Sequence, residues 1–362
     1  MRIVMVGGFL GAGKTTTLLA AARRLEASGE RVAVITNDQG TDLVDSRLAE
    51  LAAPAATAEV TGGCFCCRFD DLASTITQVA PGTTVVLAEA VGSCTDLQST
   101  VIRPLRHFYG DDLEVAPLTV LVDPARYAVL SRNWLPLADE PDLAYLYRHQ
   151  LDEADSIVIN KVDTLPLVEV EQLRAELGER FPGARIHAMS AATGDGLDGL
   201  LRTWAGAGAG AGADAGLGGR RAFAVDYDRY GAAEAELAWA NQTFQLRSEA
   251  ALAPVAWVER LLTGMGQAGA RVGHVKVLVE TPDGVTKASL TGAGAPTYDH
   301  RQLGPAQEGT VTINARVQVA PHELTSLLDR SIAAADEQVA ARSGPRSGQV
   351  FQPGFPVPVH RM

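Results

Sequence analysis

The feature that most constrains the fold is a glycine-rich run close to the start of the chain. Residues Gly8–Thr15 read GFLGAGKT and fit the pattern G-x-x-x-x-G-K-[ST] at every position. An apolar run, Ile3–Val6, precedes them and a helical pattern, Thr15–Ser28, follows, as a strand–loop–helix unit requires. Such glycines let successive backbone N–H groups point at phosphate oxygens, and the helix adds its positive N-terminal end. The run therefore predicts a nucleotide-phosphate site on an α/β sheet.

Two side chains of this loop have expected chemical roles. Lys14 would bridge the β- and γ-phosphates, and the Thr15 hydroxyl would ligate Mg²⁺. The bland alternative is a strand-to-helix turn that binds nothing, but the chain has only four lysines and one of them stands in the required position. The residues expected to contact the nucleotide here are Gly8, Gly11, Ala12, Gly13, Lys14, Thr15 and Thr16.

Residues 1–204 alternate short β-rich apolar runs with amphipathic stretches, which is typical of βα units on a parallel sheet. The runs are mostly unbroken Val, Ile and Leu, as expected of strands covered on both faces. We predict a parallel sheet of the P-loop NTPase type with helices on both faces. The expected strands are Ile3–Val6, Val32–Thr36, Thr84–Ala88, Thr119–Val122, Ser156–Ile159 and Arg185–Met189, and the expected helices are Thr15–Ser28, Leu72–Val79, Val168–Phe181 and Gly196–Trp204.

A second, smaller domain is expected beyond an Ala/Gly-rich linker. Residues 205–222 contain the run AGAGAGAGADAGLGG, which is too small and flexible to build a core. Residues 223–342 show a β-α-β-β-β-α order, which predicts an α+β domain of ferredoxin-like type, and the Pro- and Gly-rich residues 343–362 predict a flexible tail. The expected elements are Glu236–Arg247, Pro254–Met265, Val272–Glu280, Val285–Leu290, Thr310–Val319 and Pro321–Ala341.

The sequence Asn-Lys-Val-Asp at 160–163 follows the expected strand Ser156–Ile159 and bears on the choice of base. The carboxylate of Asp163 can accept both the N1–H and the N2–H of guanine, whereas adenine offers no such donor pair and would leave a buried carboxylate unpaired. The pattern therefore predicts GTP rather than ATP. The residues expected to support the base loop are Asn160, which would tie it to the phosphate loop, Lys161, whose stem would cover the base, and Ser190 and Ala191, through backbone N–H groups.

Acidic residues follow two of the expected strands. Glu89 and Gly92 form an E-x-x-G after the strand Thr84–Ala88, where the carboxylate could hold Mg²⁺ or orient the attacking water and the glycine could permit close approach to the γ-phosphate. Asp38 follows the second strand and is a weaker candidate for the Mg²⁺ shell, with an ordinary turn residue as the alternative. The predicted catalytic residues are Lys14, Glu89 and Asp38.

A cluster of cysteines predicts a metal site. Three of the four cysteines in the chain, Cys64, Cys66 and Cys67, fall within four positions. Thiolates are soft ligands that suit transition metals such as Zn²⁺, Co²⁺ and Ni²⁺, and three ligands leave one position open for a metal that is handed on. Inert buried thiols are the alternative, and a bridge between the adjacent Cys66 and Cys67 would be strained. The fourth, Cys94, is left open between a free thiol and a further ligand.

Four motifs in this order resemble one protein family. The runs GFLGAGKTT, EVTGGCFCC, EAVG and NKVD, over about residues 1–200, are similar to the CobW/HypB/UreG-type P-loop GTPases, within them the CobW-like branch. The resemblance implies GTP hydrolysis coupled to delivery of a metal, zinc first with cobalt or nickel as alternatives, to a client metalloprotein or cofactor enzyme. Turnover should be slow without a partner, because no arginine finger is identifiable. By motif, Cys64, Cys66 and Cys67 become the metal site and Glu89 the Walker-B-like acid.

The chain also departs from that family's patterns. Its seven histidines are scattered, so a histidine-rich metal-storage run is missing. Residues 37–40 read NDQG where NEFG is usual, and residues 93–96 read SCTD where LADP is common. Two other functions therefore stay open: a GTP-gated chaperone for a cofactor enzyme without metal delivery, and an ATP-using small-molecule kinase, which NKVD disfavours.

The charge of the chain limits its partners. A net charge of −12 gives no basic surface for a nucleic acid or an anionic membrane. The apolar runs are shorter than the roughly 18 residues of a membrane span, and the first one lacks a signal-peptide cleavage site. We therefore expect a cytoplasmic protein, and homodimerisation stays open.

Overall fold

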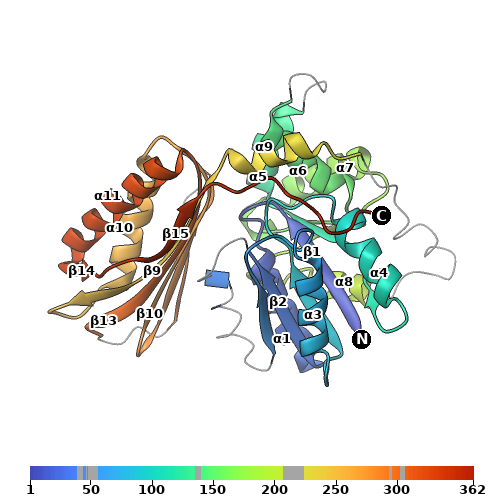
Figure 1. The fold of residues 1–362 in the computed structure, drawn as a ribbon, viewed down its shortest axis with the longest axis horizontal. Coiled ribbons are helices and arrows are strands. Elements are labelled where there is room, and N and C mark those ends of the chain that lie inside the picture. The colour runs from blue at the N-terminus through green and yellow to red at the C-terminus, as the bar shows by residue number, and fades with distance from the viewer. Residues whose placement is uncertain are drawn as a thin grey trace. The chain divides into compact units, whose positions relative to one another are not determined.

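The computed structural model describes residues 1–38, 44, 45, 47, 56–134, 140–206, 224–292, 296–301 and 306–362, with the backbone alone at 299–301. These residues divide into two compact units (Figure 1). The first contains the described part of Met1–Tyr230 except Val44, together with Phe355–Met362, and the second contains Val44 and Gly231–Gly354. Within the described residues, no helix is both long enough and apolar enough to cross a membrane.

The first unit is built on a parallel sheet in the order β3-β2-β4-β1-β6-β7-β8, with β5 beside β1. The predicted parallel α/β fold is confirmed. Its central strand β1 is almost wholly buried because apolar residues occupy both faces, and its carboxyl end runs into the glycine-rich loop. The strands are β1 (Arg2–Gly8), β2 (Val32–Asn37), β3 (Thr57–Val60), β4 (Val85–Glu89), β5 (Glu114–Val115), β6 (Thr119–Val122), β7 (Ser156–Ile159) and β8 (Arg185–Ala188).

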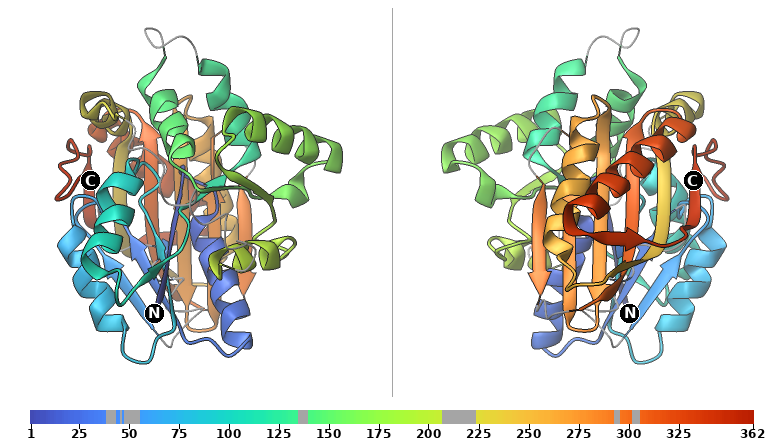
Figure 2. Two further views of the ribbon diagram at one scale, coloured as in Figure 1. Left: turned by 90° about the vertical axis from the view of Figure 1, so that its right-hand side faces the viewer. Right: turned by 90° about the vertical axis from the view of Figure 1, so that its left-hand side faces the viewer.

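Helices cover both faces of this sheet (Figure 2). In the helix after β1, Leu18, Ala21 and Ala22 face the sheet and are buried, which fixes the loop before that helix. The helices of this unit are α1 (Lys14–Ala27), α3 (Phe69–Val79), α4 (Arg103–Tyr109), α5 (Pro124–Leu130), α6 (Asp142–Asp152), α7 (Leu167–Arg180) and α8 (Leu197–Trp204), with a π-helical turn at Gln98–Ile102 and 3₁₀ turns at Ser131–Asn133 and Val162–Thr164. A further helix, α9 (Tyr227–Ala235), begins in the first unit and ends in the second. The strands β3 and β5 and the helices α4, α5, α6 and α9 were not predicted.

The second unit is an antiparallel sheet in the order β12-β11-β10-β13-β9-β14, with β15 also beside β9. Two helices lie side by side on one face (Figures 1 and 2), where Trp257, Leu261 and Leu328 are buried in its core. The predicted α+β class is confirmed, but three strands add to the predicted β-α-β-β-β-α order. The elements are β9 (Ala238–Ser248), α10 (Pro254–Gln267), β10 (Arg271–Thr281), β11 (Gly284–Leu290), β12 (Thr297–Arg301), β13 (Glu308–Gln318), α11 (Pro321–Val339), β14 (Ala341–Ser343) and β15 (Ser347–Phe351).

The expectation of a loose tail at 343–362 needs correction. Strands β14 and β15 pair with β9, whose other edge is taken by β13, so the free edge of β9 supplies hydrogen-bond partners for these residues. Residues Phe355–Met362 then belong to the first unit. The predicted linker at 205–222 lies outside the described residues from position 207 onward, so its extent stays a prediction.

Candidate nucleotide and metal site

The loop between β1 and α1 has a backbone conformation that requires glycine at certain positions. Gly8 has a φ of 129° and Gly13 a φ of 91°, in the region that L side chains rarely adopt. A Cβ at Gly13 would lie 2.3 Å from Nδ2 of Asn160. Lys14 folds over the loop, with its Nζ 2.8 Å from the carbonyl oxygen of Gly8. The backbone and the lysine are thus arranged as a phosphate site requires.

The hydroxyl of Thr15 lies beside a carboxylate that the sequence analysis missed. Thr15 Oγ1 donates to Oδ1 of Asp45 at 2.8 Å, and both residues are buried. A hydroxyl and a carboxylate are the hard oxygen ligands that Mg²⁺ prefers, so these residues fit that ion. Asp38, named from the sequence, lies directly after β2, where its N–H donates to the carbonyl of Val60 at 3.3 Å. Its role in a Mg²⁺ shell stays a prediction.

The E-x-x-G segment lies directly against the phosphate loop. Glu89 ends β4, opposite Val6 of β1, and is 3% exposed. A Cβ at Gly92 would lie 2.7 Å from Cδ2 and 3.1 Å from N of Leu10. The glycine is therefore needed for close approach to the loop itself, whereas the sequence analysis assigned it to approach of the γ-phosphate. Gln150 fixes this turn, because its Nε2 donates to the carbonyl oxygens of Gly92 at 3.0 Å and Cys94 at 2.8 Å.

Asn160 joins the base loop to the phosphate loop. Its Nδ2 donates to the carbonyl of Ala12 at 2.8 Å, and its Oδ1 accepts from the N–H of Ala191 at 3.0 Å. The N–H of Ser190 donates to the carbonyl of Asp195 at 2.9 Å. Ser190 and Ala191 were expected to offer these N–H groups to the base; in the structure they hold the turn and Asn160 instead.

Lys161, the second residue of the Asn-Lys-Val-Asp run, is held by the residue that caps a neighbouring helix. Lys161 has a φ of 61°, and its Nζ lies 2.6 Å from Oδ2 of Asp123. Asp123 in turn caps α5 by accepting from the N–H of Ala125 at 2.9 Å. Asp163 lies in the following 3₁₀ turn, and its side chain is exposed. The lysine stem is thereby fixed next to an accessible carboxylate.

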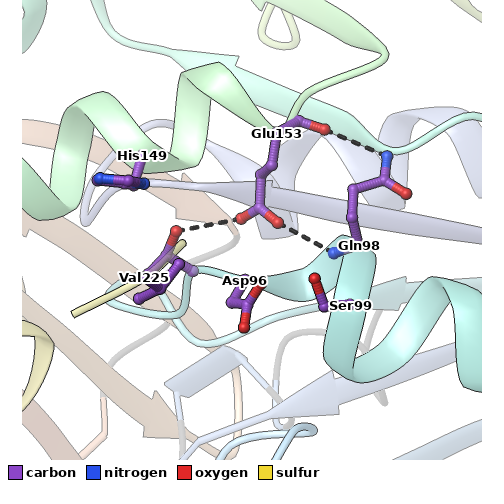
Figure 3. A pocket seen from close by; sticks show the side chains of 7 residues that line it. Asp96, Gln98, Ser99, His149, Glu153 and Val225 are labelled. Carbon is purple, nitrogen blue, oxygen red and sulfur yellow. Dashed lines mark hydrogen bonds between the residues drawn. The ribbon is translucent and has the colours of Figure 1, made fainter. Parts of the chain in front are cut away.

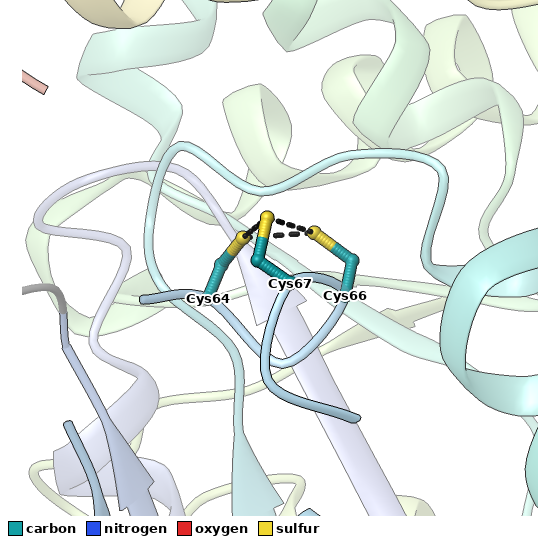
Figure 4. A group of neighbouring side chains, drawn as sticks. All are labelled: Cys64, Cys66 and Cys67. Atoms are coloured by element: carbon teal, nitrogen blue, oxygen red, sulfur yellow. Dashed lines mark hydrogen bonds between the residues drawn. The ribbon is translucent and has the colours of Figure 1, made fainter. Parts of the chain in front are cut away.

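The sulfurs of Cys64, Cys66 and Cys67 converge on the loop between β3 and α3 (Figure 4). The Sγ atoms of Cys64 and Cys66 are 2.8 Å apart, those of Cys64 and Cys67 3.3 Å, and those of Cys66 and Cys67 3.7 Å. Among the residues that the structure describes, these cysteines form the one group of three or more His, Cys, Asp or Glu side chains close enough together to hold a metal ion. The predicted ligand set is thus brought together.

Hydrogen bonds among the thiols and their burial favour the protonated form of the cysteines in the absence of a metal. Hydrogen bonding to Cys64, together with burial, raises the pKa of Cys66 well above its usual value and that of Cys67 to about 11. A metal must therefore displace protons to bind here. The buried thiol of Cys94 also interacts with those of Cys64 and Cys66, so a fourth sulfur lies beside the cluster.

Asn37, at the end of β2, holds the cysteine loop against the sheet. Its Nδ2 donates to the carbonyl oxygens of Val60 at 2.9 Å and Gly63 at 2.8 Å, and its Oδ1 accepts from the N–H of Phe65 at 3.0 Å. The sequence analysis missed this role, although an asparagine directly after a buried strand was a usable signal. Because β1, β2 and β3 run parallel in one sheet, the cysteine loop after β3 and the phosphate loop after β1 lie at the same edge, where the strands end.

A small cavity lies behind the segment that follows the E-x-x-G (Figure 3). Glu153 accepts from the N–H of Gln98 at 3.0 Å and from Oγ1 of Thr95 at 3.2 Å. Burial raises the pKa of Glu153 well above its usual value and lowers that of His149 to about 4. The hydrogen bonds that Glu153 accepts therefore hold residues 95–98 against the cavity.

Comparison with known families settles the relationship of the chain. The family model described as "CobW/HypB/UreG, nucleotide-binding domain" matches residues 2–188. The chain belongs to the CobW/HypB/UreG family. The resemblance drawn from the motifs is thus confirmed. The matched residues include the phosphate loop, the cysteine cluster, the E-x-x-G and the Asn-Lys-Val-Asp run.

Two curated relatives are both called "Zinc chaperone CobW". The protein from Pseudomonas aeruginosa is 28% identical over 226 residues, which are 53% of this chain and 57% of the relative. The protein from Sinorhizobium sp. is 27% identical over 196 residues, which are 49% of this chain and 55% of the relative. The chain thus spans little more than half the length of either relative.

Solved structures of similar proteins include the Zn(II)-bound YjiA GTPase from E. coli, at 16% identity and a TM-score of 0.38, with 91% of this chain and 98% of that chain covered. The hydrogenase maturation factor HypB from Archaeoglobus fulgidus has 18% identity and a TM-score of 0.39, with 56% of this chain and 89% of that chain covered. At TM-scores below 0.5, neither likeness carries a conclusion about this chain.

Proposed function

We propose that this chain is a Mg²⁺-dependent GTPase that couples GTP binding and hydrolysis to the handling of a transition metal at Cys64, Cys66 and Cys67. The proposal is carried by the convergence of three sulfurs on a loop that Asn37 ties to the same sheet edge as the phosphate loop. Zinc is the first candidate because thiolates favour it and because the curated relatives are named zinc chaperones. The client would be a metalloprotein or cofactor enzyme in the cytoplasm.

The residues of the phosphate site divide the work of hydrolysis. Lys14 would exchange the carbonyl of Gly8 for the β- and γ-phosphates, and Glu89 would orient the attacking water. Thr15 and Asp45 would hold Mg²⁺, which neutralises developing charge on the phosphates when it is bound. The sequence motifs identify no arginine finger, so we expect slow turnover without a partner.

Metal titration under anaerobic, reducing conditions tests the proposal. We expect Zn²⁺ to bind at one site per chain, with an affinity that differs by about tenfold between the GTP and GDP states, since coupling between sites is commonly 5–150-fold. The nucleotide-free protein serves as reference. Equal affinities in all three states would favour a GTP-gated chaperone that does not deliver metal, and no Zn²⁺ binding at all would remove the metal site.

We expect Asp45→Asn to raise the Mg²⁺ concentration needed for GTP hydrolysis by about 10–100-fold, because the amide loses the charge that a hard cation prefers. The measurement is the rate of phosphate release against Mg²⁺ concentration. Asp38→Asn is the comparison variant, since Asp38 is the acid named from the sequence and its backbone N–H donates to the carbonyl of Val60. A larger effect at Asp38 would restore the choice made from the sequence and reject Asp45.

Asp163→Asn is expected to lower the affinity for GTP by about 10–100-fold, because a charged acceptor facing two guanine donors is replaced by an amide that places a donor there. ATP affinity should stay as weak as in the parent protein. Competition binding of GTP, GDP and ATP measures both quantities. The preference for guanine would have to arise elsewhere if the variant kept the parent's ratio of GTP to ATP affinity.

A further inference from the structure

Residues Phe355–Met362, here called the strap, cross the cysteine loop of the first unit. The N–H of Val357 donates to Sγ of Cys67 at 3.2 Å, and the N–H of Val359 donates to the carbonyl oxygen of Cys66 at 2.9 Å. Two adjacent members of the cluster are thus held by backbone groups from the far end of the sequence. One of these bonds ends on a sulfur that would ligate the metal.

The sequence of the strap suits this contact. Pro356 and Pro358 alternate with the two valines, so residues 356–359 keep N–H groups only at Val357 and Val359, which donate to the cysteine loop. Pro358 also restricts Val357 to extended conformations, which lowers the entropy lost when the strap is bound. The side chain of Val357 is 75% exposed, so the backbone rather than the side chain makes the contact.

The other end of the strap is fastened to the segment after the E-x-x-G. Arg361 Nε donates to Oδ2 of Asp96 at 2.8 Å, and the N–H of Met362 donates to the carbonyl of Ser99 at 2.9 Å. Asp96 is 4% exposed with a φ of 61°, and its Oδ2 also accepts from the hydroxyl of Tyr227 at 2.7 Å. The carboxylate of Asp96 is therefore held in place by Tyr227 as well as by Arg361.

Between the two ends, the ring of His360 packs against aromatic side chains. Its centroid lies 5.0 Å from those of Phe69, at the start of the helix after the cysteines, and Phe108. The strap thus has contacts at its cysteine end, its middle and its Asp96 end, all within the first unit.

We propose that the strap is a positioning element of the metal site: Val357 holds the Cys67 sulfur, and the Arg361–Asp96 pair joins that sulfur to the segment that follows Glu89. This inference rests on the proposed function and names its regulation. A movement of the E-x-x-G segment on GTP binding would then act on the cysteines through the strap. A client that takes the metal would compete for the same two backbone hydrogen bonds.

The first test compares Val357→Pro with Val357→Ala. Proline removes the N–H that Cys67 accepts but suits an extended segment between two prolines, whereas alanine keeps the N–H. We expect Zn²⁺ to dissociate about tenfold faster from Val357→Pro than from Val357→Ala, as is usual when a partner of a metal ligand is lost. The measurement is stopped-flow transfer of Zn²⁺ to a chromophoric chelator, with GTP affinity as a check that each variant is folded. Equal rates for the two variants would overturn the positioning role.

The second test concerns the anchor. Arg361→Gln removes the charged partner of Asp96, so the ratio of Zn²⁺ affinities in the GTP and GDP states should fall towards one. Arg342→Gln, in β14 of the second unit, is the matched control and should keep the parent ratio. An unchanged ratio in Arg361→Gln would overturn the link to the nucleotide segment.

Different results would reject the metal-handling function and the role of the strap. A parent protein that binds no Zn²⁺ would remove the proposed function itself. A parent that binds Zn²⁺ with a nucleotide-dependent affinity, beside strap variants that all behave like their controls, would leave the function standing and reject the strap.

Discussion

Lys14→Ala is expected to reduce the affinity for GTP by at least about 100-fold, because the only cation of the phosphate loop is lost from charge-assisted contacts with two phosphates. In the structure its Nζ is held at the carbonyl of Gly8, over the loop where the phosphates would lie. Isothermal titration with GTP or GDP in the presence of Mg²⁺ measures the effect. Hydrolysis should become undetectable at GTP concentrations that saturate the parent protein.

Lys287→Ala is the matched control for this variant. Lys287 lies in β11 of the second unit, so the same change of residue type and charge is made outside the nucleotide site. The melting temperature of Lys14→Ala should stay close to that of the parent, since Lys14 is only partly buried and its hydrogen bond to the carbonyl of Gly8 contributes about 1 kcal/mol. Tight GTP binding by a folded Lys14→Ala protein would disprove the assignment of the phosphate loop.

Cys66→Ser is expected to weaken Zn²⁺ binding by more than about 100-fold, because loss of a direct thiolate ligand exceeds the 10–100-fold usual for residues one shell further out. In the absence of metal, GTP affinity should stay within about twofold of the parent, as the cysteine loop and the phosphate loop follow different strands. Competition with a chromophoric chelator measures the Zn²⁺ affinity. Fewer protons should also be released on binding, since one protonated thiol is missing.

Cys94→Ser extends this experiment to the fourth cysteine. Its thiol interacts with those of Cys64 and Cys66, yet the group close enough to share one ion consists of Cys64, Cys66 and Cys67. A loss as large as that of Cys66→Ser would make Cys94 a further ligand, whereas parent-like affinity would leave it a buried thiol. Parent-like Zn²⁺ affinity and stoichiometry in Cys66→Ser itself would contradict the metal site.

The parallel sheet could be predicted because its strands are marked locally. The strands β6 and β7 read TVLV and SIVI, mostly apolar runs whose residues are all buried, and their predicted bounds match the structure. The strand β3 reads TAEV and carries a charged residue, so its sequence gives no comparable signal. It joins the sheet by pairing in parallel with the edge of β2 that β4 leaves free.

Some residues of the site could likewise be predicted from the sequence, and others could not. The phosphate loop and the three cysteines are short runs whose spacing is itself the chemistry, so a pattern indicates them. Asp45 has no such mark: only the fold places its carboxylate 2.8 Å from the Thr15 hydroxyl. Asn37 was part of a noted run, but its three hydrogen bonds to the cysteine loop could not be foreseen from neighbours in sequence.

The sequence by itself determined the family, the parallel α/β fold of the first unit and the residues of the phosphate and cysteine loops, because each depends on residues within a few positions of one another. Tertiary structure alone decided which acid meets Thr15 and what the final residues do. Prolines remove backbone donors and predict a loose tail, yet the N–H groups that remain at Val357 and Val359 find acceptors at Cys67 and Cys66, almost 300 positions earlier. Partners so far apart in sequence leave no local pattern, so only the folded chain reveals them.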